Sequence, residues 1–150
     1  MAYITTTQLS ARLGSTLYAR LTDRVNGSVA DVAVAQQVVD EAEAEADSYL
    51  SVRYATPVDL TTHPELSNVL EARVLDLAEH AAWQGSPFVN DVPGRIQSLY
   101  LAALKWFESA AAGAVNLPSA TPAAGPTAED DSPRYTARGR TFTGDELDGL

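Results

Sequence analysis

The chain of 150 residues contains no cysteine and only one lysine, and it has no apolar run of the roughly 20 residues needed to cross a bilayer. Without cysteine there is no disulfide, no thiolate nucleophile and no cysteine-ligated zinc site. The formal net charge is −10. This charge argues against a sequence-independent grip on DNA, because that grip requires clustered Lys and Arg. We therefore expect no membrane span and no specific DNA binding.

The N-terminus lacks the basic start and the apolar stretch of a secretory signal, so we expect the protein to be made and kept in a cytoplasm. Its 45% hydrophobic residues are enough for one modest core. One domain followed by a less apolar segment is the simplest organisation for this length.

Helical periodicity dominates the chain as far as Gly113. We predict two short N-terminal helices separated at Gly14, the first capped by a threonine among residues 5–7. Three longer helices are expected over residues 31–54, 64–84 and 91–112, with Asp91 as the N-cap of the last and Gly113 at its C-terminal end. The fold class is therefore all-α, a small bundle of four to five helices. Its predicted core includes Leu50, Leu70, Val74, Leu77, Ile96, Leu99 and Leu104.

After Gly113 the composition changes to a run rich in alanine, proline and threonine. Such a segment cannot bury enough apolar surface to fold alone. We therefore expect a helical domain at residues 1–113 and an extended tail, disordered in its first part, at residues 114–150. The domain carries 7 basic and 14 acidic residues and the tail carries 3 and 6, with all three tail arginines close together near large apolar residues. We predict that the tail binds a partner through Arg134, Arg138, Arg140, Phe142, Leu147 and Leu150.

Acidic residues of the predicted 31–54 helix raise the question of a metal site. Hard-cation sites normally take oxygen ligands from loop backbone as well as from carboxylates, so a solvated outer helix face is the better interpretation. The segment from Asp23 to Asp31 resembles a calcium loop at Asn26-Gly27 and Val29 but lacks the acidic first and last ligands. We expect no metal and no cofactor. The acidic residues in question are Asp40, Glu41, Glu43, Glu45 and Asp47.

No arrangement of residues typical of an enzyme is present. The chain has no nucleophile elbow and no phosphate-binding glycine loop. His63 precedes the helix start at Pro64, and His80, one turn after Asp76, is expected to make a surface or interface contact. We expect no catalytic residue. Aromatic side chains on acidic helices without interleaved cations favour core and subunit contacts over base stacking. These are Tyr49, Tyr54, Trp83, Trp106 and Phe107.

Several short segments occur in a characteristic order along nearly the whole chain. They are Leu9-x-x-Arg12-Leu13-Gly14, residues 44–50 (AEADSYL) followed by Arg53-Tyr54 and Pro57, residues 104–107 (LKWF), and residues 140–147 (RTFTGDEL). Together they resemble the Mu-like head-tail connector, or head completion, proteins of tailed bacteriophages and prophages.

The resemblance implies an oligomeric ring beneath the portal, at the portal vertex of a virion assembled in the bacterial cytoplasm. Its partners would be the portal protein, a neck or tail-completion protein, and further copies of itself, commonly about twelve in one ring. DNA would pass through the ring during genome packaging without specific binding. The alternative is a soluble helical interaction module of a prophage with no virion role, which would stay a monomer or dimer even with portal.

Overall fold

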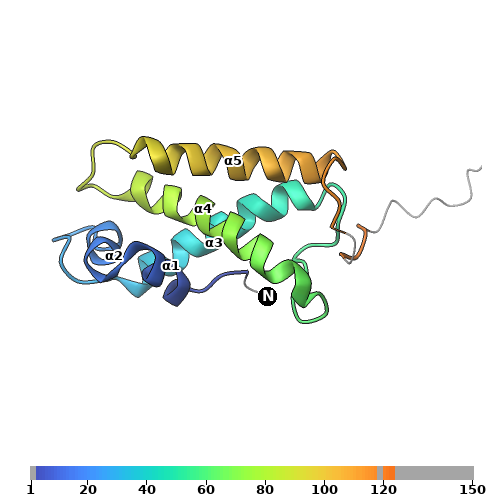
Figure 1. Cartoon of the computed structure of the whole chain (residues 1–150). Coiled ribbons are helices and arrows are strands. Elements are labelled where there is room, and N and C mark those ends of the chain that lie inside the picture. The colour runs from blue at the N-terminus through green and yellow to red at the C-terminus, as the bar shows by residue number, and fades with distance from the viewer. Residues whose placement is uncertain (1–2, 118–119, 124–150) are drawn as a thin grey trace, which may run out of the picture.

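The computed structural model describes residues 3–117 and 120–123, which form an all-α bundle (Figure 1). This confirms the predicted fold class. The described residues contain no β-strand, and an isolated bridge pairs Tyr54 with Pro122. The helices are α1 (Thr6–Leu13), α2 (Ser15–Thr22), α3 (Val32–Leu50), the 3₁₀ turn η1 (Pro64–Leu66), α4 (Ser67–Gly85) and α5 (Gly94–Ala111).

Local chemistry explains where most helices begin. The Thr5 hydroxyl accepts the backbone N–H of Gln8, whose side chain accepts the Thr5 N–H in return, so a capping box starts α1. Gly14 has φ of 79°, a conformation that favours glycine, and it separates α1 from α2 as predicted. The Asp31 carboxylate accepts two backbone N–H groups at the start of α3.

Two predicted helix boundaries differ from the structure. The long helix α3 ends at Leu50 rather than at Tyr54, because the backbone on both sides of Tyr54 pairs with residues 121 and 123 instead of continuing the helix. Asp91 is not the N-cap of α5. That helix begins at Gly94 after Pro93 and has no side-chain cap.

Helices α3, α4 and α5 pack against one another, and the short pair α1–α2 covers one side of α3 and α4 (Figure 1). Small side chains allow this close approach, while Phe107 and Leu77 supply bulk at the centre. The fully buried alanines of the three long helices are Ala35, Ala42, Ala46, Ala78, Ala82, Ala103 and Ala110.

The predicted core is largely confirmed. Leu50, Leu70, Val74, Leu77 and Ile96 are buried. Leu99 and Leu104 are only half-buried, so α5 turns a narrower apolar face inward than its periodicity indicates.

The acidic face of α3 was expected to be solvated, and this is wrong for three of its five carboxylates. Glu43 accepts the backbone N–H groups of Tyr3 at 2.6 Å and Ile4 at 3.0 Å. Asp47 accepts the Tyr3 hydroxyl, and burial raises the pKa of its carboxyl. Glu45 accepts the hydroxyl of Tyr100 at 3.1 Å. These half-buried acids hold the N-terminal segment and α5 onto α3.

The described residues that follow Gly113 lie against the helices, although we expected a disordered segment from residue 114. Leu117 and Ala120 are buried, and the Leu117 N–H donates to the Tyr54 hydroxyl at 3.1 Å. The Ala123 N–H donates to the Arg53 carbonyl at 2.9 Å. Residues 114–117 and 120–123, here called the strap, therefore belong to the helical body.

Candidate protein-docking site

The predicted partner-binding tail residues lie outside the described residues, and their role stays a prediction. They are Arg134, Arg138, Arg140, Phe142, Leu147 and Leu150.

The loop between α2 and α3 is organised by one carboxylate. Asp23 accepts the backbone N–H groups of Val25 (2.9 Å) and Asn26 (3.1 Å) on one oxygen, and those of Ser28 (3.0 Å) and Val29 (3.2 Å) on the other. These four hydrogen bonds hold the pKa of Asp23 well below its usual range. The carboxylate is thus occupied in shaping the loop.

The loop between α4 and α5 lies against the first loop at the same end of the bundle (Figure 1). Gly27 has φ of 66°, and a Cβ added to it would lie 3.2 Å from the Phe88 ring. The Ser86 hydroxyl donates to the Arg20 carbonyl at 3.3 Å, and the Arg20 guanidinium reaches the Phe88 carbonyl at 3.5 Å. The two loops therefore form one continuous surface.

Exposed apolar side chains gather on this surface. Val25 is 80% exposed, Val29 72%, Val32 64% and Phe88 37%. Valines that a fixed loop exposes to solvent do not contribute to the stability of the core. Exposed apolar side chains that cluster in this way mark contact surfaces. We call Val25, Val29, Val32 and Phe88 the apolar end. Sequence reasoning missed it, although two valines inside a turn-rich segment were the available signal.

The opposite end of the bundle is formed by the strap and the C-terminal end of α3. A hollow of about 410 Å³ lies between the strap and residues 53–54, which follow α3. It contains one charged group, the Arg53 guanidinium, which rests on the Gly113 backbone. The described lining of the hollow contains no carboxylate and no histidine. Its lining residues are Arg53, Tyr54, Asn116, Leu117, Ala120 and Pro122.

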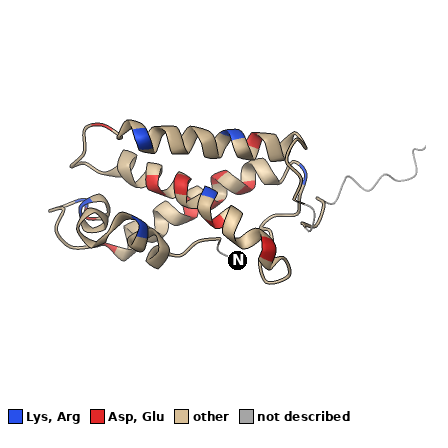
Figure 2. Ribbon diagram, in the orientation of Figure 1, with Lys and Arg blue, Asp and Glu red and all other residues tan. Residues whose placement is uncertain are grey.

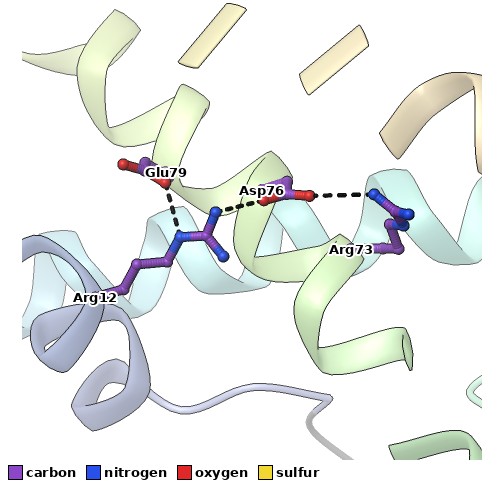
Figure 3. Close-up of polar contacts among 4 residues, drawn as sticks. All are labelled: Arg12, Arg73, Asp76 and Glu79. Atoms are coloured by element: carbon purple, nitrogen blue, oxygen red, sulfur yellow. Dashed lines mark hydrogen bonds and ion pairs between the residues drawn. The ribbon is translucent and has the colours of Figure 1, made fainter. Parts of the chain in front are cut away.

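The most concentrated charge in the described part joins α1 to α4 (Figure 3). Arg12 contacts Asp76 at 2.5 Å and Glu79 at 2.8 Å, and Arg73 lies 3.6 Å from the other Asp76 oxygen. Opposite charges satisfy one another here, and the Asp76 side chain is 7% exposed. The cluster fixes the α1–α2 pair in place.

The histidines lie apart from one another. His80 was expected at a surface or interface, and this is wrong: it is buried, its Nε2 lies 2.9 Å from the Gln97 amide oxygen, and its ring stacks on Tyr100 at 3.8 Å. His63 lies 3.7 Å from Glu65 beside η1. Within the described ranges no group of three His, Cys, Asp or Glu side chains is placed to hold a metal ion.

The aromatic residues lie mainly inside the bundle, as predicted. Phe107 is fully buried, Trp106 meets it edge-on at 5.1 Å, and Tyr49 stacks on it at 6.4 Å. Tyr54 is also buried, and Trp83 packs half-buried against the core. These rings stabilise the helix packing.

Fold and surface together define a small all-α bundle protein with an apolar end and a strapped end. None of the helices in the described part is long and apolar enough to span a bilayer. The model of the family described as Bacteriophage Mu, Gp36 matches residues 3–134, so the chain belongs to that family and is a bacteriophage protein. No curated protein matches the chain.

Proposed function

We propose that this phage protein is a structural virion subunit: a head-to-tail connector (adaptor) that forms a ring beneath the portal and completes the head. It lines the DNA passage and joins the head to the neck or tail. It acts without cofactor, metal or catalysis. Its partners are the portal protein, a neck or tail-completion protein, and other copies of itself.

The observation that carries this proposal is that the two ends of the bundle offer different contacts. The apolar end presents valines and a phenylalanine on two joined loops and on the first residue of α3. At the opposite end lies the strap, the last described part of the chain (Figure 1). A connector needs two distinct contacts at opposite ends, one for each neighbour.

Charge supports the same role. The formal net charge of −10 disfavours adhesion to the DNA backbone, which suits a wall that DNA must slide past. Eight of the 25 buried apolar residues of the described part are alanines, so the core is modest for a free monomer. Assembly would bury further apolar surface and add stability.

The deciding experiment is localisation in particles. A phage carrying a nonsense mutation in this gene should produce heads filled with DNA that lack tails, and the supplied wild-type chain should restore joining. Averaging of purified wild-type particles should place the chain as a ring at the portal vertex. Normal tailed particles from the mutant, with the chain absent from virions, would favour the interaction module of a prophage. Such a module stays a monomer or dimer when its mass is measured with portal.

The apolar end is tested separately. The double substitution Val25→Ser and Val29→Ser should leave the fold intact, because both side chains are exposed, and should weaken binding to the portal or neck partner at least about tenfold. Val69→Ser is the matched control, since Val69 is exposed on α4 away from both loops. Equal binding by all three proteins would remove the apolar end from the proposal.

A further inference from the structure

The outer faces of α3 and α5 carry opposite charges. The exposed residues of each helix recur at intervals of three and four, so they form one face. On α3 this face includes Gln36, Gln37, Asp40, Glu41, Ala44 and Ser48. On α5 it includes Arg95, Ser98, Leu101, Ala102, Lys105 and Glu108 (Figure 2).

These charges are not neutralised within the described part of the chain. Arg95 and Lys105 take part in none of its ion pairs. Asp40 and Glu41 accept only side-chain amide hydrogen bonds from the preceding helical turn, at 2.8 and 3.2 Å. Leu101, 54% exposed, lies between the two cations of α5. Each face thus has charges free to pair with another molecule.

The charges also match in their positions along the bundle. Helices α3 and α5 begin at the same end and run in the same direction (Figure 1). Asp31 is the N-cap of α3 and Arg95 is the second residue of α5. Glu41 and Lys105 each follow ten residues later, a rise of about 15 Å in a helix.

We infer that the α3 face of one copy of this chain docks on the α5 face of the next copy, with the helices parallel. Arg95 then lies level with Asp31, and Lys105 lies level with Asp40 and Glu41. Glu108 falls level with Ala44, where no acidic residue opposes it. The inference deepens the proposed ring, on which it rests, by naming the contact between neighbouring subunits.

The arrangement of charge selects this pairing over a two-fold dimer. Contact of α3 with α3 would bring Asp40 and Glu41 of both copies together, and like charges opposed across an interface weaken it. Contact of α3 with α5 is heterologous, so a pair of copies retains one free α5 face on the first copy and one free α3 face on the second. Repetition closes a ring when the rotation between copies permits.

Cross-linking tests the contact, and the absence of native cysteine makes it specific. The full chain carrying Gln37→Cys and Ala102→Cys places one exposed thiol on each face at matching levels. Oxidation of purified protein and of particles should give a ladder extending beyond dimers. The control pair Val69→Cys and Ala102→Cys moves one thiol to α4 and should give no ladder. The chain with Ala102→Cys alone carries one thiol, so its cross-linked products should be no larger than dimers.

The outcomes separate this inference from the proposed function. A ring seen in particles without a ladder overturns the contact and leaves the connector role intact. A ladder from purified protein, with the chain absent from particles, supports the contact and overturns the connector role. Absence of both overturns both.

Charge reversal provides an independent test with the same cross-link. Lys105→Glu, or Glu41→Lys, should each lower the ladder yield about tenfold, because each opposes like charges at the level that residues 41 and 105 share. The chain with both substitutions keeps the net charge of the wild type and should recover the ladder. If bulk repulsion alone governed assembly, the Glu41→Lys variant would assemble better than wild type. That result, or failure of the double variant to recover while circular dichroism shows it folded, would overturn the inference.

Discussion

At the scale of single residues, Asp23 shows how one side chain shapes a surface. Its two oxygens accept four backbone N–H groups from the loop that carries Val25 and Val29. A neutral amide in its place has one acceptor oxygen and no charge, so it cannot hold the same four donors.

We predict that Asp23→Asn loosens this loop. Hydrogen exchange of the backbone amides of residues 25–29 should become severalfold faster, while exchange in α4 and α5 stays unchanged. Asp40→Asn is the control, because Asp40 is an exposed carboxylate on α3 that accepts no backbone N–H in the described structure. Unaltered exchange in Asp23→Asn would show that the loop is held by other contacts.

The same carboxylate makes the loop sensitive to acid. The pKa of Asp23 in the folded protein lies below its unfolded value of about 4. Its contribution to stability is therefore complete above that value and is lost as the pH falls through the lowered pKa. Amide protection in the wild-type loop should persist below pH 4 and then decline, whereas the Asp23→Asn loop should show no such step.

Buried and exposed leucines provide a second contrast at this scale. Leu77 on α4 is 1% exposed, whereas Leu101 on α5 is 54% exposed. We predict that Leu77→Ala lowers the free energy of unfolding by about 2–5 kcal/mol, because it removes core contacts and leaves a cavity. Leu101→Ala should change it by less than about 0.5 kcal/mol. Urea titration of both variants checks this prediction. Equal free energies of unfolding would mean that Leu77 does not lie on the buried face of α4.

At the scale of elements, α1 is attached to α4 by a compact ion cluster. Arg12 pairs with Asp76 and Glu79, and Asp76 is buried (Figure 3). Such a carboxylate loses its hydration on folding, so removal of its partner leaves a charge that is only partly compensated by Arg73.

We predict that Arg12→Met destabilises the protein by about 1–3 kcal/mol. Hydrogen exchange in α1 should rise more than in α5, since α1 loses its main polar attachment. Arg24→Met is the control, because Arg24 is exposed and takes part in none of the ion pairs of the described residues. In a double-mutant cycle of Arg12→Met with Asp76→Asn, we expect a coupling energy that clearly stabilises the folded protein. A coupling energy near zero would show that the ion cluster is unimportant.

Elements were predictable from the sequence where their signals are local. Apolar spacing and capping residues predicted the five α-helices and the break at Gly14. Contacts distant in sequence could not be predicted in this way. The end of α3 at Leu50 depends on pairing with residues 121 and 123, and Glu43 turns inward because Tyr3 and Ile4 donate to it.

The candidate site was less predictable than the fold. The turn at Asn26-Gly27 was evident, but a turn signal does not tell which neighbouring side chains remain exposed. The apolar end exists because the Asp23 loop meets Phe88 of another loop, a tertiary contact. The α3 acids were recognised as a cluster, yet only the arrangement of helices separates outward Asp40 and Glu41 from inward Glu43 and Asp47.

At the scale of the whole molecule, the boundary between body and tail determines what a truncation does. The strap supplies buried Leu117 and Ala120 and the backbone partners of Arg53 and Ala55. Removal of everything after Gly113 takes away the strap, whereas a chain that ends at residue 133 keeps it.

We predict opposite results for these two truncations. The chain ending at residue 133 should keep its free energy of unfolding within about 0.5 kcal/mol of wild type and should fail to support head completion, because it lacks Arg134, Arg138, Arg140 and Phe142. The chain ending at residue 113 should lose about 2–4 kcal/mol, chiefly through exposure of the surface that Leu117 covers.

Urea titration and complementation of the nonsense-mutant phage measure the two effects separately. Within the tail, Phe142→Ala should impair joining more than any one arginine-to-alanine change, because a docked aromatic anchor contributes more binding energy than a charge at the rim. Full complementation by the chain ending at residue 133 would show that the tail has no assembly role, and the connection would then depend on the apolar end alone.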